Sequence, residues 1–380
     1  MTQTLTNSPK KLVHLPYLDS LRGLSALYVV MVHLLMTLPA NGNLPSDKVF
    51  AAIFKYGHSA VDLFIILSGF CLMLPVIRNE GKLRGSIILF FKKRVRRILP
   101  PYYITIGLSL LLIATVIGEK TGSQWDSAIP VTMEGIIAHL ILIHDFFSGI
   151  NFQINGVLWS ISVEFRIYLL FPLILFFWRK LGGFTTTLIT IVLSYALFIP
   201  LNLLHLNTSP WGICPHYFGL FTLGMLAVEV AFSQEDTYTN IRKKLPWGLM
   251  TLVFAGVAII AFRTIFISPF VTPLWSLCDL AAGICFFCLL ISVSSNQKNW
   301  FYPILAWKPL VFIGTFSYSI YLIHSPLMQL FYQYIVKPLA LTSFISTPIL
   351  SCLMIIFIIP ISYLFFLIAE KPFMNNKKLS

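Results

Sequence analysis

Charged residues are scarce in this sequence. Only 11% of the 380 residues are Asp, Glu, Lys or Arg, whereas soluble domains contain roughly a quarter. A water-soluble chain with 57% hydrophobic residues would have to expose a large apolar surface. The composition therefore excludes an ordinary soluble domain. A mean hydropathy of +0.83 and an aromatic content of 15% are typical of membrane helices that end in interfacial aromatic belts.

Paired cysteines and an excess of acidic residues are also missing. The six cysteines lie inside or at the edges of apolar stretches, without paired spacing in a loop. This pattern argues against disulfides and a zinc site, and we expect no metal. The net charge of +13 would indicate a nucleic-acid binder in a soluble protein. Here the basic residues fall between apolar spans, so we expect no nucleic-acid partner and interpret them as topology signals.

Apolar stretches long enough to cross a bilayer recur along the whole chain. The fold class predicted is an all-α, polytopic membrane protein with about ten transmembrane helices in one domain, 20–369. The segments 1–19 and 370–380 are expected to be cytoplasmic. The segment 134–145 is apolar but too short to cross, which predicts a re-entrant or interfacial helix. The predicted spans are 20–38, 58–77, 98–117, 157–178, 184–204, 211–232, 246–267, 272–294, 309–335 and 339–368.

The distribution of basic residues predicts the orientation. With both termini in the cytoplasm, 21 Lys and Arg lie on the cytoplasmic side and five on the opposite side, as the positive-inside rule requires. An eleventh span at 134–145 would break this alternation. No small-residue cleavage site follows the first apolar stretch, which predicts a retained helix. We therefore expect a multi-pass protein of the inner or plasma membrane.

The first span carries a cation and an imidazole on one face. Arg22 and His33 are eleven residues apart, so a helix brings them to the same face within ~20° with a rise of ~16 Å. Such a stripe suits a substrate like coenzyme A (CoA), with its phosphates near the cytoplasm and its thioester deeper. The alternative is a snorkelling arginine and a hydrogen-bonded histidine. The sequence favours neither.

Two further stretches carry candidate polar groups. Asp62 in the second span either orients an imidazole or pairs with Arg22, while Ser68-Gly69 more simply permits close helix packing than supplies a nucleophile. Five basic residues at 92–97, including Arg94 and Arg97, directly precede Pro100-Pro101. A helix beginning at these prolines would place arginines at its amino-terminal end, a favourable anion site. The alternative is a basic cluster that contacts acidic lipid.

Ionisable groups recur in the fourth and ninth spans. Glu164 and Arg166 are two residues apart, on different faces of a helix, so they do not neutralise each other. Tyr318 and His324 lie in the ninth span, and the predicted depth of His324 is similar to that of His33. The two histidines are therefore candidates for one shared site, or each is a separate structural donor. Buried ionisable groups of this kind predict a functional or architectural polar site.

Taken together, the motifs resemble those of acyltransferase family 3, the integral-membrane O-acyltransferases of glycans and small molecules. The resemblance covers nearly the whole chain, in the expected order. It rests on Leu-Asp-Ser-Leu-Arg-Gly followed by His33, Val-Asp-Leu-Phe-Ile-Ile-Leu-Ser-Gly-Phe, Lys-Arg-Val-Arg-Arg-Ile-Leu-Pro, Trp-Ser-Ile-Ser-Val-Glu, Ser-Tyr-Ser-Ile-Tyr-Leu-Ile-His-Ser-Pro and Ala-Glu-Lys-Pro near Glu370. Some family members carry an extra esterase-like domain, which we do not expect here.

The resemblance implies roles for particular residues. It makes His33 the catalytic residue, with Arg22 and Glu164 in matching motif positions, and it places Arg94 and Arg97 among the cytoplasmic arginines of the family. The implied enzyme transfers an acyl group, by default acetyl, from acyl-CoA to a hydroxyl. The implied acceptor is a glycan, a lipid-linked glycan or a small molecule.

Two mechanisms and one other function class remain open at this point. In one mechanism His33 is a general base on the acceptor hydroxyl, and in the other it carries a transient acyl group. The alternative class is a transporter or flippase for a lipid-linked glycan, which would use the same buried charges as a substrate path.

Overall fold

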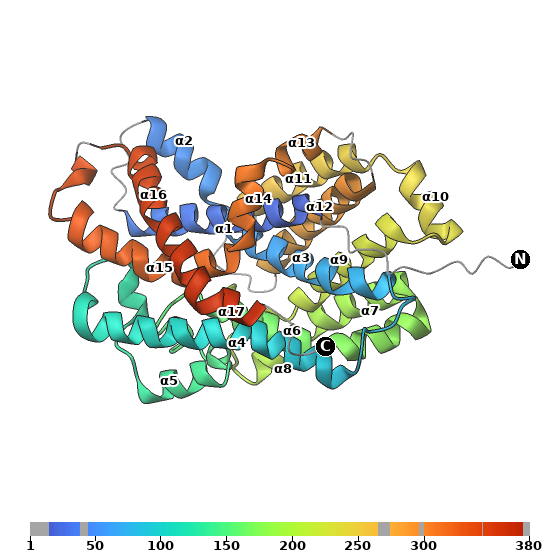
Figure 1. The fold of residues 1–380 in the computed structure, drawn as a ribbon, viewed down its shortest axis with the longest axis horizontal. Coiled ribbons are helices and arrows are strands. Elements are labelled where there is room, and N and C mark those ends of the chain that lie inside the picture. The colour runs from blue at the N-terminus through green and yellow to red at the C-terminus, as the bar shows by residue number, and fades with distance from the viewer. Residues whose placement is uncertain (1–14, 39–44, 265–273, 296–299, 344, 375–380) are drawn as a thin grey trace, which may run out of the picture.

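The structure is a computed structural model that describes residues 15–38, 45–264, 274–295, 300–343 and 345–374. Within these ranges every regular element is a helix, which confirms the all-α prediction. Eight helical segments are long and apolar enough to cross a membrane, and the number rises to ten if each of two bent helix pairs is one span. This agrees with the ten predicted spans. Several of the helices, α1, α3 and α4 among them, run across the view of Figure 1 roughly along the long axis of the molecule.

The straight candidate spans combine long helices with their short continuations. They are α1 (Pro16–Thr37), α2 (Pro45–Phe54) with α3 (His58–Ile77), α4 (Ile87–Leu112), α6 (Trp159–Leu181), α7 (Gly183–Ala196) with α8 (Phe198–Leu203), α11 (Trp247–Thr264), α12 (Trp275–Ser295), and α16 (Thr347–Phe365) with α17 (Lys371–Met374). The bent pairs are α9 (Tyr217–Phe232) with α10 (Asp236–Lys244), at 92°, and α14 (Lys308–Thr315) with α15 (Ser317–Phe331), at 74°.

Large aliphatic side chains cover much of the outer surface of the bundle. Leu188 on α7, Ile260 on α11 and Ile356 on α16 are each more than 60% exposed. Surface of this kind would drive aggregation in water but is the normal covering of a helix that faces lipid. The exposed apolar side chains therefore support the multi-pass membrane assignment independently of hydropathy.

Helix α3 lies at the centre of the bundle and packs closely against α9. A Cβ atom on Gly69 would lie 2.0 Å from the carbonyl oxygen of Phe221, and one on Gly224 would lie 2.0 Å from that of Ile66. Only glycine permits such an approach of two backbones, a common device of membrane helices. The interpretation of Ser68-Gly69 as a packing position is confirmed for Gly69.

A second close contact joins α1 to the broken span. A Cβ atom on Gly314, at the end of α14, would lie 1.8 Å from the backbone oxygen of Asp19. The helix then breaks at Phe316, whose φ and ψ of −126° and 24° are not helical. The Gly314 contact therefore brings the first turns of α1 against the break between α14 and α15.

Helix α4 corrects one prediction. It begins at Ile87, where the hydroxyl of Ser86 caps it by accepting from the amide of Leu89, rather than near residue 98. Pro100 and Pro101 lie inside the helix, so the basic cluster does not stand at a helix amino-terminus. The prediction was wrong because the charged cluster looked like the boundary of a span, whereas the helix continues through it.

The short apolar segment at 134–145 behaves as predicted. It forms α5 (Met133–Leu140), followed by a single 3-10 turn at His144–Phe146. Eight residues of helix extend only ~12 Å, far less than the ~30 Å of a bilayer core. The segment therefore does not cross.

Other span boundaries differ from the predictions by several residues. The sixth begins at Tyr217 rather than 211, and the ninth is interrupted at Phe316. The tenth begins at Thr347 rather than 339, with Pro348 in the first turn of α16. Proline favours the first turn of a helix because it has no N–H to leave unpaired there. The helix therefore starts next to this proline, although the residues before it are also apolar.

The contact of α3 with α9 predicts the effect of a single methyl group. Gly224→Ala should lower the thermal melting temperature and the folded yield, because overpacking costs about 1–3 kcal/mol. Gly107→Ala in α4 is the control, since no atom lies within 4 Å of a Cβ built there. Melting in detergent compares the two variants, and equal stability would contradict the packing of α3 on α9.

Candidate active site

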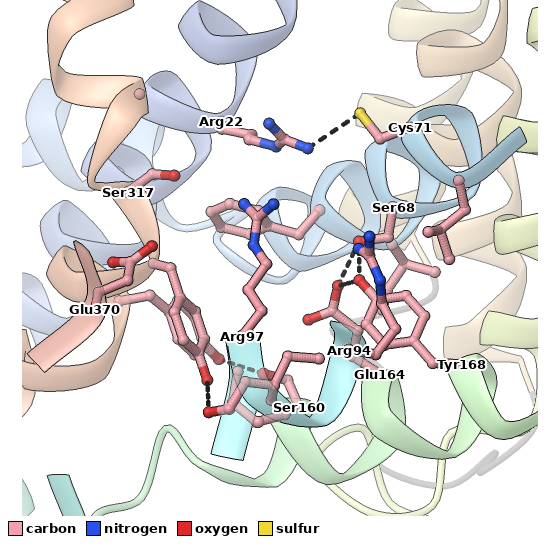
Figure 2. Close-up of a pocket in the computed structure, with 18 of the residues that line it drawn as sticks. Arg22, Ser68, Cys71, Arg94, Arg97, Ser160, Glu164, Tyr168, Ser317 and Glu370 are labelled. Carbon is pink, nitrogen blue, oxygen red and sulfur yellow. Dashed lines mark hydrogen bonds between the residues drawn. The ribbon is translucent and has the colours of Figure 1, made fainter. Parts of the chain in front are cut away.

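A cavity of about 480 Å³ lies among α1, α3, α4, α6 and the break between α14 and α15. Figure 2 shows its polar side chains converging from these elements. Its wall contains three arginines, three carboxylic acids and several hydroxyls, and so many ionisable groups between apolar helices mark a functional site. The ionisable wall residues are Asp19, Arg22, Arg94, Arg97, Glu164 and Glu370.

Two of the arginines come from α4. Arg94 and Arg97 are three residues apart, so one face of the helix presents both to the cavity. In Figure 2 Arg97 extends into the middle of the space, while Arg94 lies beside Glu164. Within the described ranges neither guanidinium makes an ion pair. The α4 arginines therefore keep their donors available for an anion.

The third arginine comes from α1 and is held more firmly. Arg22 lies 3.4 Å from a carboxylate oxygen of Asp19 and donates to the sulfur of Cys71 on α3 at 3.0 Å. Both contacts leave several of its five donors unused. Three guanidinium groups from two helices thus face one cavity.

The glutamates of the cavity are hydrogen bonded to hydroxyl groups rather than to arginines. Glu164 accepts from Ser68 on α3 and from Tyr168, one turn further along α6. Glu370 accepts from Ser319 at 2.5 Å and is 2% exposed. Hydroxyl donors satisfy these carboxyl groups without consuming the positive charge of the arginines.

The break in the ninth span contributes the amino-terminal end of α15. Ser317 and Tyr318 line the cavity there, and the Tyr318 hydroxyl donates to the carbonyl of Ile98 on α4 at 3.2 Å. A helix amino-terminus carries partial positive charge and unpaired amides. The broken span thus adds to the positive potential at the cavity, in a place where non-helical backbone lines a cavity rather than lipid.

His33 and His324 form a pair outside the lining of the cavity. Nδ1 of His33 on α1 lies 3.1 Å from Nε2 of His324 on α15. Tyr321, three residues before His324, lines the cavity, and its hydroxyl contacts Ser160 at 2.6 Å and donates to the carbonyl of Val157. The histidine pair therefore lies one helical turn beyond the cavity wall.

Hydrogen bonds fix which nitrogen of each ring carries the proton. Nδ1 of His324 contacts only carbonyl oxygens, those of Tyr321 at 2.7 Å and Ile320 at 3.1 Å, so it must be the donor. Even one imidazolium ion buried among apolar helices would be costly, so both rings are neutral. Nε2 of His324 is therefore an acceptor and faces His33.

The same reasoning then applies to His33. Its Nδ1 faces two acceptors, the carbonyl of Val29 at 3.0 Å and Nε2 of His324. Nδ1 must therefore carry the proton, which leaves the lone pair on Nε2. No described residue hydrogen bonds to that atom. The pair holds His33 in the tautomer whose free Nε2 can accept a proton or attack a carbonyl.

A proline supports the position of His324. Pro326 has no N–H, so the carbonyl of Leu322 lacks its helical partner. The side chain of Asn155, fully buried, donates to this carbonyl at 3.0 Å. The loop before α6 is thus tied to α15 next to His324.

Two other predicted residues lie elsewhere. Arg166 donates to both carboxylate oxygens of the buried Asp145, one at 2.9 Å, and to the carbonyl of Leu142. It anchors the segment after α5 to α6, whereas Glu164 points into the cavity, as their opposite helix faces predict.

Asp62 lies beside His58 and Asp279, not beside Arg22. Of the two alternatives for Asp62, the structure favours proximity to an imidazole.

Several cavity residues were not singled out from the sequence. Glu370 was assigned to the cytoplasmic tail, but the helical chain continues to Met374 and buries it. Ser68 was predicted to permit packing rather than to line a site. Tyr168 carried a usable signal, because it follows Glu164 by four residues and so lies on the same helix face.

Comparison with known proteins gives an independent result. A family model described as an acyltransferase domain matches residues 15–367. The chain is 26% identical to the peptidoglycan O-acetyltransferase OatA of Listeria monocytogenes serovar 1/2a over 83% of its length and 50% of the relative. It is 25% identical to the O-acetyltransferase OatA of Staphylococcus aureus strain NCTC 8325 over 85% and 52% of the two chains.

A third relative is the putative peptidoglycan O-acetyltransferase YrhL of Bacillus subtilis strain 168, with 24% identity over 83% of this chain and 49% of the relative. The chain thus spans about half the length of the curated relatives it matches. No solved structure matches it significantly. The domain match over nearly the whole chain agrees with the motifs of the sequence and with the cavity that gathers them. The chain belongs to acyltransferase family 3, a family of membrane acyltransferases.

Proposed function

We propose that this protein transfers an acetyl group from acetyl-CoA to a hydroxyl of a glycan or another acceptor of the cell envelope. Family membership supports acyl transfer, and the names of three relatives, all O-acetyltransferases, favour acetyl and a hydroxyl acceptor. The observation that carries the proposal is the combination of three arginines at one cavity with a histidine whose Nε2 is free.

The arginines suit the donor. CoA carries phosphate groups, which guanidinium groups bind through paired, charge-assisted hydrogen bonds. Arg94 and Arg97 make no ion pair with any described residue, and Arg22 adds a third positive charge from the facing helix. These arginines lie on the side that the distribution of basic residues predicts to be cytoplasmic. We therefore expect the donor to enter from the cytoplasm.

We expect His33 to activate the acceptor. In the proposed step its Nε2 takes the proton of the acceptor hydroxyl while that oxygen attacks the thioester carbonyl. The carbon–sulfur bond then breaks, and the CoA thiolate leaves with the proton from the imidazolium. The shared face of α1 that carries Arg22 and His33 would align the phosphates and the thioester of one donor molecule.

The rival mechanism uses the same atom differently. Nε2 of His33 would attack the thioester and hold the acetyl group as an acyl-imidazole before the hydroxyl receives it. Incubating the protein with labelled acetyl-CoA without acceptor separates the two, because only the rival leaves the label on the protein. The transporter alternative gains no support from the comparisons and predicts no consumption of acetyl-CoA.

Loss of the imidazole should abolish most of the activity. His33→Ala is expected to lower kcat about 10²–10⁴-fold, the usual contribution of a general base. Release of CoA by purified protein with an acceptor glycan measures this. His205→Asn is the control, because His205 is exposed in a loop with a φ of 54°, which Asn tolerates. Full activity of His33→Ala would rule out both mechanisms.

His324 is a positioning residue, and two substitutions test this. Gln keeps an acceptor near the position of Nε2, whereas Leu removes it, so His324→Gln should retain most of kcat and His324→Leu should lose about tenfold or more. The KM for acetyl-CoA should be unchanged in both, since His324 does not line the cavity. An equal loss of kcat in both variants would contradict the proposal that His324 controls the tautomer of His33.

The α4 arginines should affect donor binding rather than chemistry. Replacing Arg94 or Arg97 with Gln is expected to raise the KM for acetyl-CoA about tenfold or more, because each charged hydrogen bond is worth about 1.5–3 kcal/mol. Arg96→Gln is the matched control on the same helix, since Arg96 is not part of the cavity wall. If Arg96→Gln raises KM as much, general surface charge rather than a phosphate site explains the effect.

A further inference from the structure

A second group of ionisable side chains lies outside the cavity, where three helices begin. His58 is the first residue of α3 and Asp62 lies one turn further on. His216 directly precedes α9, and Asp279 lies in the second turn of α12. Asp62, Asp279 and His216 are at most 1% exposed, and the side chain of His58 is 8% exposed. These four residues are called the α3–α9–α12 cluster.

The carboxylates of this cluster are short of donors. Both imidazoles approach the same oxygen of Asp279, His58 through Nε2 at 3.1 Å and His216 through Nε2 at 2.9 Å. Its other oxygen, and both oxygens of Asp62, have no hydrogen-bond partner of good geometry among the described residues. A buried carboxylate without a partner is costly and calls for an unseen counter-charge.

Burial disfavours negative charge on these acids, and the surrounding helix ends partly offset that cost. The amino-terminal ends of α3, α9 and α12 meet here, and helix amino-termini stabilise negative charge. Aromatic side chains enclose the cluster: Trp159 stacks on His58 with 5° between the rings, and Trp275 meets His58 edge-on. Two adjacent carboxylates in an enclosed, water-poor site require a compact positive charge between them.

We propose that Nε2 of His58 and the carboxylates of Asp62 and Asp279 bind one divalent transition-metal ion. The three ligand atoms lie within 4.8 Å of one another. Because such bonds measure about 2.0–2.2 Å, the ligand atoms of a tetrahedral ion are roughly 3.4 Å apart, so shifts of about one ångström close the site. His216 then orients Asp279 from outside, as second ligand shells commonly do.

The donor set selects the class of metal. Imidazole together with carboxylates suits Zn²⁺, Mn²⁺ or Fe²⁺, whereas Mg²⁺ and Ca²⁺ prefer oxygen ligands alone. Tyr217, whose hydroxyl lies 3.1 Å from Nε2 of His58, is available as a further oxygen donor. The ion would cross-link α3 to α12, two helices whose ligands are more than 200 residues apart in the chain.

The proposed ion would also support the acyl-transfer site without taking part in the reaction. Trp159, stacked on His58, directly precedes Ser160, which contacts the hydroxyl of Tyr321 in the cavity wall. An ion that fixes His58 would therefore fix the start of α6 next to that wall. We assign it a structural role.

Metal content measured on the purified full-length chain tests the proposal. The protein is treated with EDTA, reloaded with Zn²⁺ or Mn²⁺, desalted, and analysed by mass spectrometry for metals and by thermal melting. The wild type should retain about one ion per chain and melt at a higher temperature after reloading. Asp62→Asn and His58→Gln should lose both effects. Glu229→Gln should keep them, because Glu229 is hydrogen bonded to Trp178 and Tyr238 away from the cluster.

Two outcomes would overturn the proposal. The first is a folded wild-type protein that retains neither metal. The carboxylates of the cluster would then be neutralised by shared protons instead of an ion. This result does not depend on whether any variant folds. The second is an Asp62→Asn variant that retains the ion as the wild type does. Because neither measurement involves acetyl-CoA, failure here is distinguishable from failure of the proposed acyl transfer.

Discussion

Charged groups between membrane helices must be neutralised by something other than water, and this constraint organises the whole interior of the protein. Glu164 and Glu370 are satisfied by hydroxyls, and Arg166 by Asp145. The α4 arginines are one exception, since no described acid pairs with them, and the carboxylates of the α3–α9–α12 cluster are another. In an apolar bundle, guanidinium groups without an ion-pair partner are stable only with water or an anion present. The substrate site is thus one place where internal charges are left without a direct partner.

Close backbone packing makes this arrangement possible. Gly69 and Gly224 bring α3 against α9, and Gly314 brings the break of the ninth span against the start of α1. The break ends α14 and begins α15 beside Arg22, so a gap in regular structure becomes part of the cavity wall. Pro326 frees a carbonyl that Asn155 then uses to hold α15 near His324. Each irregularity in the helices therefore has a contact that compensates for it.

The sequence predicted the apolar spans well where their ends were sharply marked. The second span was predicted at 58–77, and α3 covers the same residues because polar positions flank it. The start of α4 was missed because hydropathy treats a basic cluster as a boundary, although arginine side chains can remain inside a helix that borders a cavity. The role of Glu370 was missed because its partner Ser319 lies 51 residues away.

The histidine pair was predicted only as two residues at a similar depth, because depth follows from hydropathy whereas rotation and crossing of helices do not. The tautomer of His33 depends on a contact between residues 291 positions apart. Of the α3–α9–α12 cluster the sequence singled out only Asp62, for the same reason, since Asp279 alone in an apolar helix indicates no partner. The sequence shows which polar groups lie in the membrane helices. Which of these groups contact one another is decided by how the helices pack.

The most direct test of the account is a structure of the protein with a non-transferable acetyl-CoA analogue, in which a ketone replaces the thioester. If acetyl-CoA is the donor, the account predicts that the phosphates of the analogue lie within hydrogen-bond distance of Arg22, Arg94 and Arg97, with the ketone carbonyl directed towards Nε2 of His33. An analogue bound outside the cavity, or bound there with its acyl end directed away from His33, would contradict it.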